Sequence, residues 1–336
     1  MKAKPAPTVA ATSTPVPDIS TPLKINQQGP NTPPPGLDNF GPLQFLVGNW
    51  NSQPAAPNEL KGYNVMPLPQ ATAPNMFILR DFGYYEEMTI GTIDGNAPNR
   101  GGVVQQNCAV LFYDQRVYFG EGSPQNQLVH AENGSWLYLT MHPQLQGPNN
   151  DGGPIPSPPA PNPIPPQDPN LNMVKQVSVP HGNSILSTGS YHRISGPPTI
   201  GDVSTLPYGA GVTPSFYTPF GSTGPSDPNN HSNLMVNPNF VLQQAIQGQN
   251  IAETIIFTVS TKNPGGSVTN IDFETKRAHV QSYTTTVWLE RLEGEDTFNQ
   301  LQYTQTIELT FIQNNVTYIH IDANTLTRIP YPNCGQ

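Results

Sequence analysis

Short apolar runs that alternate with polar residues recur from Leu37 almost to the end of the chain. A period of two residues places every second side chain of a β-strand on one face, against a core. The pattern predicts strands at residues 75–90, 103–113, 116–120, 128–140, 173–179, 184–191, 253–261, 268–273, 278–292, 301–312 and 316–322, with 325–329 extending the last. Turn-forming residues between these runs, such as Asp114-Gln115 and 180–183, predict hairpins. The chain is therefore expected to be all-β and antiparallel.

One segment has the pattern of a helix. Residues 238–247 carry an apolar stripe, with Asn237 as the expected N-cap, Pro238 at the first helical position and Gly248 as the stop. A single helical turn is also predicted near residues 40–46, before a strand that begins through Gly48.

Three segments rich in proline and glycine contain no strand pattern. Residues 1–36 have few large apolar side chains to offset the entropy of ordering, so we expect a disordered tail. Residues of about 144–172 and 195–235 are predicted to be long loops, because proline cannot donate a ladder hydrogen bond. Loops of this length usually cover something, so we expect a lid or belt over one end of the domain.

Closure of the sheet is the simplest arrangement for these strands. Roughly ten antiparallel strands joined mostly by turns leave two exposed edges, and a closed barrel removes both. The sequence therefore predicts one barrel domain over residues 37–332, with one short helix and the two loop insertions. A barrel of this size can hold one small ligand.

The amino-acid composition limits the classes of molecule that the chain is expected to bind. Of 336 residues, 40 are proline and 29 are glycine, and only 11% are charged, against about 25% in an average domain. The net charge is −9 and the 14 lysines and arginines are scattered, which argues against nucleic-acid binding. No run approaches the ~18 apolar residues of a membrane span, and the first residues lack the apolar stretch of a signal peptide, so a cytoplasmic protein is expected.

The two cysteines carry no metal motif. Cys108 lies in an apolar run and is expected to be a buried thiol, while Cys334 lies near the chain end; their spacing does not argue for a disulfide.

Three histidines are candidate site residues. His130 and Glu132 share a strand face, so they form either an inward acid–base pair or a cross-strand pair at the barrel rim. His320 is either a metal or haem ligand or a core histidine. His181 lies in a turn and either reaches over the barrel mouth or is solvated.

Two carboxylate groups are weaker candidates. They comprise Asp81 with Glu86 and Glu87, and Glu290 with Glu293 and Glu295, of which the second set is expected to be a solvated strand end.

Two motifs resemble a known family. The segments Phe45-Leu-Val-Gly-Asn-Trp50 and His130-Ala-Glu-Asn-Gly-Ser-Trp136 resemble those of nitrobindin-like, fatty-acid-binding-protein-like haem barrels. The resemblance implies a calycin-like β-barrel in which Trp50 and Trp136 line the cofactor site. It also implies that His320, in a C-terminal strand, ligates the haem iron. The family's barrel is shorter, so the two loop segments are additions, and its iron-ligating histidine lies nearer the strand end than His320.

Three functions follow from these residues. The first is binding of haem or another flat apolar small molecule, with His320 as iron ligand and His130, His181, Trp50 and Trp136 around it; gas binding or weak peroxidase-like chemistry would depend on the haem. The second is an enzyme that acts on an apolar small molecule through His130 and Glu132. The third is a surface or assembly protein without catalysis.

Overall fold

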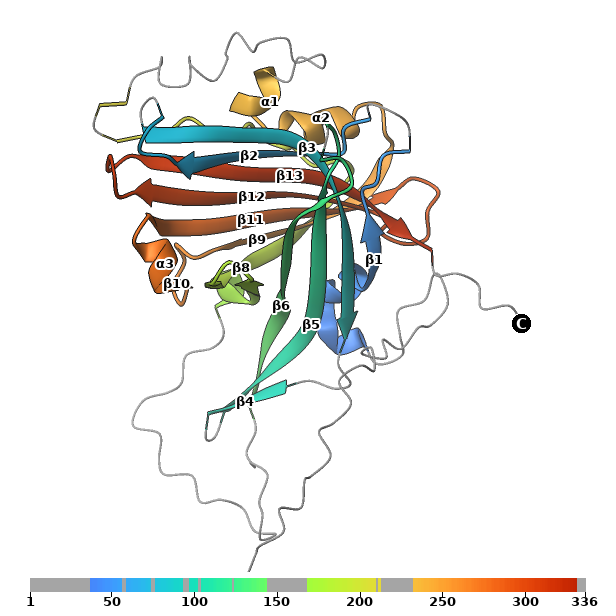
Figure 1. Cartoon of the computed structure of the whole chain (residues 1–336). Coiled ribbons are helices and arrows are strands. Elements are labelled where there is room, and N and C mark those ends of the chain that lie inside the picture. The colour runs from blue at the N-terminus through green and yellow to red at the C-terminus, as the bar shows by residue number, and fades with distance from the viewer. Residues whose placement is uncertain are drawn as a thin grey trace, which may run out of the picture.

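The computed structural model of the chain describes residues 37–55, 59–73, 76–92, 97–101, 104–122, 124–143, 168–209, 211–212 and 232–330 (Figure 1). The predicted tail at 1–36, much of the two predicted loops and Cys334 fall outside the described residues.

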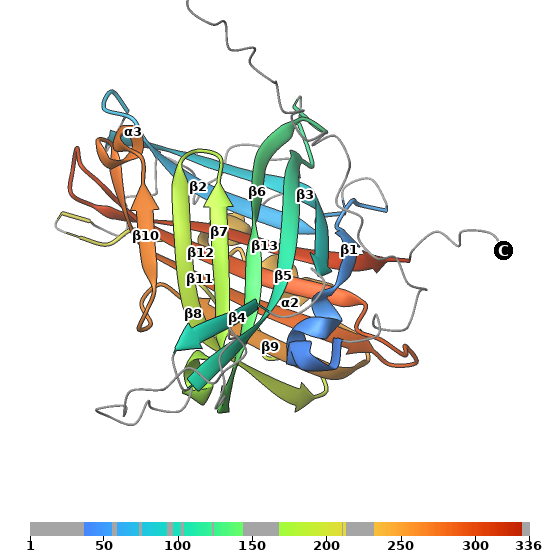
Figure 2. The same cartoon turned by 90° about the horizontal axis from the view of Figure 1, so that it is seen from below.

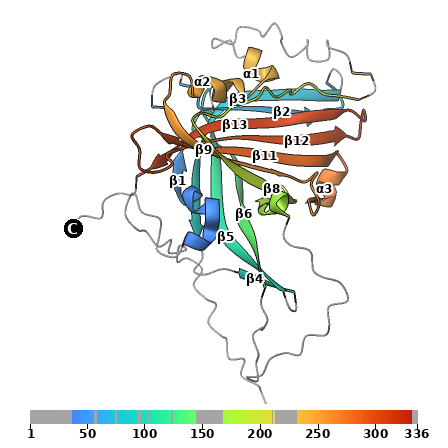
Figure 3. The ribbon, with the colours of Figure 1, turned by 180° about the vertical axis from the view of Figure 1, so that it is seen from behind.

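Ten antiparallel strands close a barrel, as the alternation predicted. In barrel order they are β3 (Phe77–Thr92), β2 (Gly62–Pro69), β13 (Thr317–Ile329), β12 (Gln300–Phe311), β11 (Ala278–Leu292), β9 (Ile251–Ser260), β8 (Asn183–Ser195), β7 (Met173–Val179), β6 (Leu128–Pro143) and β5 (Val104–Phe119). Pairing of β5 with β3, for example Tyr113 with Ile90, completes the ring. The strands β11–β13 cross β5 and β6 steeply, so the barrel is flattened (Figures 1 and 3).

Three short strands extend this ring. β1 (Gly48–Asn51) pairs with β3 and β13 beyond the end of β2, β4 (Ala97–Gly101) pairs with β5, and β10 (Ser267–Asn270) pairs with β8.

The prediction of a turn at Asp114-Gln115 was wrong. β5 runs without interruption through both residues, because the two-residue alternation continues across them. Tyr113, Gln115 and Val117 are buried on the inner face, whereas Asp114 pairs with Arg116 at the surface, with Oδ1 and Nε 3.3 Å apart. A turn-forming residue type was outweighed by the burial of its neighbours.

β2 is a strand that the sequence did not predict, because it contains Pro67 and Pro69. β13 pairs with β2 only from Gly62 to Val65. β3 pairs with β2 along the whole of β2, as far as Pro69. The prolines therefore lie where one ladder partner is missing, which is where a strand tolerates them.

The helices are short. They are the 3₁₀ segments η1 (Leu37–Leu46) and η3 (Pro169–Leu171), and α1 (Ser232–Val236), α2 (Phe240–Ala245) and α3 (Asp272–Thr275). The predicted helix at 238–247 is α2, but it begins later than expected and Asn239, not Asn237, precedes it. Asn237 instead donates to Asp202 Oδ1 at 2.8 Å. α2 also ends earlier than expected, at Ala245 with Ile246 as its C-cap, and Gly248 follows with a φ of 74°.

The described residues of the second predicted loop pack against the barrel in two places. Ile200 packs with α1 and α2 on the outer wall formed by β2, β9, β11 and β13, where Tyr63 and Trp288 are buried (Figure 1). Further along the loop, Tyr208 pairs with Thr317, and Val212 packs against the cluster that contains Phe77 and Tyr318 at the start of β3 and β13. The predicted lid or belt over one end therefore stays a prediction.

One end of the barrel is closed by η1, the predicted helical turn (Figure 2). Phe40, Leu43 and Leu46 are buried among inward side chains of β3, β5, β6, β9 and β11–β13. Gly41 allows this plug, since its φ is 52° and a Cβ there would contact the ring of Tyr138. The inner core at this end is apolar.

Among the described residues, no helix is both long enough and apolar enough to cross a lipid bilayer.

Candidate functional site

The half of the barrel interior away from η1 contains buried charged and polar side chains. Strand register places them on the inner face of β2, β3, β5–β7 and β11–β13. They are Asn64, Glu86, Gln115, Glu132, Lys175, Thr285, Tyr303 and Asn324, and the partly buried Gln305 and Asp322 lie on the same face. Buried charges cost free energy unless they are paired, so this half of the interior is not what folding alone would select.

Lys175 of β7 lies at the centre of this half. Its Nζ is 2.7 Å from Tyr283 Oη, 3.5 Å from Gln305 Oε1 and 3.6 Å from Glu132 Oε1. The ammonium also lies 5.2–5.7 Å from the ring centroids of Tyr113, Trp136 and Tyr283. Burial lowers the pKa of Lys175, but Tyr283 and Glu132 outweigh that effect and raise it, so the lysine stays charged.

Glu132 of β6 is the anion of this pair. Tyr113 Oη donates to its Oε1 at 3.0 Å, and His130 Nε2 lies 3.6 Å from its Oε2. Burial would raise the pKa of Glu132, but the charge of Lys175 and the contact with His130 hold it below its ordinary value. His130 and Glu132 lie on one face of β6, as predicted; Glu132 is buried in the interior and His130 is partly exposed.

The lack of a side chain at Gly134 leaves the space through which the Tyr113 ring reaches Glu132. Gly134 pairs with Tyr113 across β5 and β6, and a Cβ at this position would overlap the carbonyl oxygen of Gln176 and contact the Tyr113 ring. The Glu132-x-Gly134-x-Trp136 motif therefore has a structural role, because glycine leaves room for the aromatic ring between two inward side chains.

Glu86 of β3 is a second buried carboxyl, and its pKa is raised whereas that of Glu132 is lowered. Gln115 Nε2 and Tyr303 Oη donate to its Oε2 at 2.7 and 2.8 Å, and Tyr84 Oη lies 2.9 Å from Tyr303 Oη. Burial raises the pKa of Glu86 to about 7, although the bonds from Tyr303 and Gln115 lower it. Its Oε1 makes no hydrogen bond within the described part of the chain.

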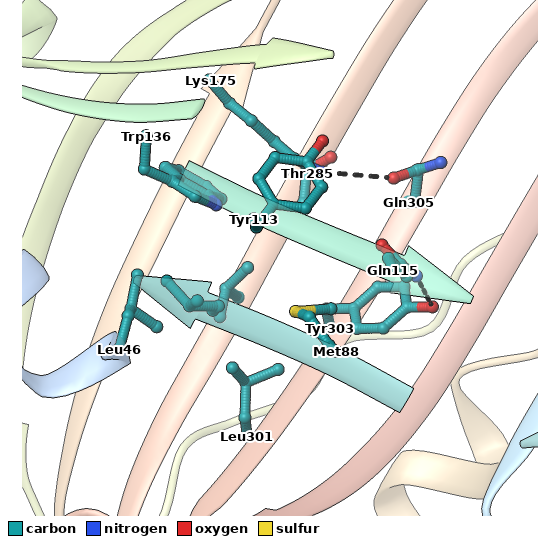
Figure 4. A pocket seen from close by; sticks show the side chains of 12 residues that line it. Leu46, Met88, Tyr113, Gln115, Trp136, Lys175, Thr285, Leu301, Tyr303 and Gln305 are labelled. Carbon is teal, nitrogen blue, oxygen red and sulfur yellow. Dashed lines mark hydrogen bonds between the residues drawn. The ribbon is translucent and has the colours of Figure 1, made fainter. Parts of the chain in front are cut away.

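A small cavity lies between the apolar and polar halves (Figure 4). Its volume is about 30 Å³, which is room for about two water molecules. The lining residues are Leu46, Met88, Ile90, Tyr113, Gln115, Trp136, Lys175, Thr285, Val287, Leu301, Tyr303 and Gln305. The surface that these side chains expose to the cavity is mostly apolar, although the polar residues among them come from β5, β7, β11 and β12.

The three candidate histidines lie toward the opposite end from η1. The side chain of His130 is 29% exposed while that of Glu132 is 1% exposed, so His130 stands between Glu132 and solvent. The rings of His130 and His181 are 5.6 Å apart, and His181 is exposed. The contact with Glu132 outweighs burial and raises the pKa of His130.

His320 of β13 makes a separate contact at the same end. Its Nε2 lies 3.0 Å from Asn64 Nδ2 and 3.3 Å from Asp322 Oδ2, and Asn64 also bonds Asp322. Burial would raise the pKa of Asp322, but His320 and Asn64 lower it. His130 lies close enough to Asp322 that its charge also lowers the pKa of this carboxyl.

The two predicted tryptophans differ in position. Trp136 lines the cavity. Trp50 belongs to the plugged end, where its Nε1 donates to Leu46 O at 2.9 Å and the guanidinium of Arg328 lies 4.3 Å from its ring centroid. Its contacts support the plug.

Each of the two predicted carboxylate groups contains one buried and two exposed side chains. Asp81 and Glu87 are exposed, whereas Glu86 points inward. Glu290 is buried, so it is not the solvated strand end that was expected; Gln300 Nε2 donates to it at 2.6 Å, and burial raises its pKa to about 7. Glu293 and Glu295 are exposed as expected, and Cys108 is buried as expected.

Sequence reasoning missed Lys175, Gln115 and Tyr303. Each lies in an ordinary strand pattern, and their partners lie on strands distant in sequence. The available signal was one lysine within an apolar alternating run, Met173-Val-Lys-Gln-Val177, where period-two counting places Lys175 on the same face as Met173 and Val177.

No protein-family model matches this chain, and no curated protein is significantly similar to it in sequence.

Proposed function

We propose that the barrel binds a small molecule in the cavity between its apolar and polar halves. A closed antiparallel barrel is a fold that can enclose a ligand. The observation that carries the proposal is a mostly apolar cavity inside a barrel, with Lys175, Gln115 and Thr285 among its lining residues. A mostly apolar pocket with a few convergent polar groups and perturbed pKa values is the usual form of a binding site.

Entry is proposed at the end marked by His130. The opposite end is closed by η1, whereas His130 is the partly exposed residue in contact with buried Glu132. A ligand that enters here passes Glu132 and Lys175 before it reaches the apolar floor, so these side chains would select among molecules.

The test compares the chain with a variant whose cavity is filled. Val287 lines the cavity and is buried, so Val287→Ile adds one methylene to a space of about 30 Å³. Saturation-transfer NMR with molecules of about two heavy atoms, the size that the cavity admits, should detect binding to the wild-type chain and none to Val287→Ile. Absence of transfer for every molecule in the wild-type chain, or equal transfer in both proteins, would contradict the proposal.

Haem, which the family resemblance implies, does not fit the interior as it stands. The cavity of about 30 Å³ is far below the ~300–1,000 Å³ of sites for larger ligands. His320 Nε2 is in contact with Asn64 and Asp322, and Trp50 lies in the plugged end.

Haem binding and the gas or peroxidase-like chemistry that depends on it therefore stay predictions. Their test is the absorption spectrum of the full chain after haem addition: a Soret band that His320→Ala abolishes would support them, and an unaltered haem spectrum would remove them.

The two alternative functions also stay predictions. His130 and Glu132 are 3.6 Å apart, a loose version of the contact that an acid–base pair needs. Turnover of a small molecule that is lost in Glu132→Gln while folding is kept would favour an enzyme. Concentration-dependent assembly in native mass measurements, without any bound small molecule, would favour an assembly protein.

A further inference from the structure

The polar side chains that line the cavity make hydrogen bonds with groups along or behind its wall. The amide nitrogen of Gln115 donates to Glu86 Oε2 at 2.7 Å and to Tyr303 Oη at 3.3 Å. Tyr303 Oη donates to the same carboxyl oxygen at 2.8 Å, and Tyr113 Oη donates to Glu132 Oε1 at 3.0 Å. Neither glutamate lines the cavity, so these bonds draw the polar atoms of the wall away from it.

The hydroxyl of Tyr283, another residue behind the wall, binds the remaining polar groups. It lies 2.7 Å from Lys175 Nζ and donates to Gln305 Oε1 at 2.6 Å. Burial raises the pKa of Tyr283 to about 12, although the Lys175 ammonium and a hydrogen bond from Thr285 lower it. Glu132, with Oε1 3.6 Å from Nζ, balances the charge of the lysine. Lining residues of β7, β11 and β12 therefore share one hydroxyl outside the cavity.

The surface that is left facing the cavity is mostly apolar, and Leu46, Met88, Trp136 and Leu301 are part of it (Figure 4). A buried water needs about two to four polar partners, and a cavity without them stays dry. The volume of about 30 Å³ admits a molecule of about two heavy atoms. Size and polarity therefore restrict the occupant together.

We propose, on the basis of the binding function proposed above, that the cavity binds a dissolved apolar gas whose molecules have two heavy atoms, the class that includes dioxygen. Its contacts are with Leu46, Met88 and Leu301, and the affinity comes from the removal of apolar surface from water. A polar molecule of equal size is excluded, because it would lose its hydrogen bonds to water without replacement.

Ethane and methanol separate polarity from size, since each has two heavy atoms. The full chain, labelled at methionine methyl groups, is titrated with each compound while the Met88 methyl resonance is followed; Met88→Leu assigns the signal. We expect a saturable shift with ethane. Methanol should bind at least about tenfold more weakly, because its hydroxyl would be buried without a partner.

Dioxygen itself is tested by its paramagnetism, which accelerates the relaxation of nearby methyl groups. Two other methionines are references within the same chain: Met235 is 4% exposed and packs outside the cavity, and Met76 is 42% exposed to solvent. Met88 is partly exposed, so solvent contact alone would place its relaxation between the two references. Binding in the cavity predicts relaxation several-fold faster than that of either.

Two substitutions at Val287, a buried lining residue, form a matched pair. Val287→Ile fills the cavity and should abolish both the ethane shift and the excess relaxation of Met88 by dioxygen. Val287→Thr keeps the shape of the side chain but adds a hydroxyl, so it should weaken ethane binding and strengthen methanol binding. Thermal unfolding verifies that each variant is folded.

The failures of the two proposals are distinguishable. Methanol binding as tightly as ethane, or a Met88 relaxation rate in dioxygen between those of Met76 and Met235 while methanol binds, would overturn the apolar-gas proposal and leave a binding cavity in place. A Met88 methyl that responds to none of the three compounds would overturn both this inference and the proposed function.

Discussion

The buried pair of Lys175 and Glu132 gives the sharpest energetic prediction. Their side chains are 7% and 1% exposed, and Nζ and Oε1 are 3.6 Å apart. Replacement of Lys175 by methionine keeps a flexible apolar stem but leaves Glu132 buried without its cation. Removal of one partner of a buried ion pair costs about 3–5 kcal/mol, which is a large part of the 5–15 kcal/mol that stabilises a typical domain. We expect a loss of that size at pH 7.

The dependence of this loss on pH follows from the pKa of Glu132. In the wild-type chain this pKa is lowered, so Glu132 contributes stability above its ordinary pKa of 4.5, and the contribution is lost as the pH falls through the folded value. In Lys175→Met, burial without the lysine raises the pKa, so the penalty is present at neutral pH and disappears once Glu132 is protonated. The gap between the two proteins should therefore narrow from pH 7 to pH 4.

Urea unfolding followed by tryptophan fluorescence measures these differences, since Trp136 lies beside Lys175. The control is the double variant Lys175→Met/Glu132→Gln, which removes both charges and should recover most of the loss. A loss under about 1 kcal/mol in Lys175→Met at pH 7, or a double variant as unstable as the single one, would refute the interpretation of a buried, mutually dependent pair.

Three further predictions test the interior. Glu86→Gln should remove a pH dependence: the folded pKa of Glu86 is raised to about 7, so its stabilising effect is complete below 4.5 and is lost as the pH rises through 7. Unfolding at pH 5 and pH 7 should show a change of about 2 kcal/mol in the wild-type chain that the variant lacks, and equal pH dependence in both proteins would contradict it. Gly134→Ala should destabilise the protein by more than about 2 kcal/mol, because the added Cβ would overlap Gln176. The control Gly201→Ala, with open space around it, should change stability by under about 0.5 kcal/mol. Similar melting temperatures for the two variants would show that the backbone at Gln176 does not closely approach Gly134. Val287→Ile should raise stability by up to about 0.8 kcal/mol in urea unfolding, and a loss of more than about 1 kcal/mol would mean that the cavity cannot accept a methylene.

The sequence predicted the strands and their closure well, for a physical reason. Alternation of apolar and polar residues reports which strand face is buried, and hairpin turns constrain neighbouring strands to pair. The pattern identified β6 with His130 and Glu132 on one face, and the structure confirms it. The errors at Asp114-Gln115 and Pro67 arose where a turn-forming or strand-breaking residue type was accommodated by tertiary pairing.

The site was much less predictable. Lys175 and Glu132 are 43 positions apart in the numbering, and Glu86 and Tyr303 are far more distant, so only the register around the whole barrel brings them together. Period-two counting shows that a side chain points inward, but it does not show what lies opposite. The resemblance directed attention to His320 and Trp50, whose contacts in the structure are with Asp322 and with the plug.

The most direct test of the central claim is a crystal structure of the full chain under xenon pressure. Xenon enters apolar cavities that solvent leaves dry. The account predicts one xenon site among Leu46, Met88, Trp136 and Leu301, with Lys175 and Glu132 paired beside it. A barrel interior fully occupied by side chains, with no xenon between these residues and with Glu132 turned to solvent, would contradict it.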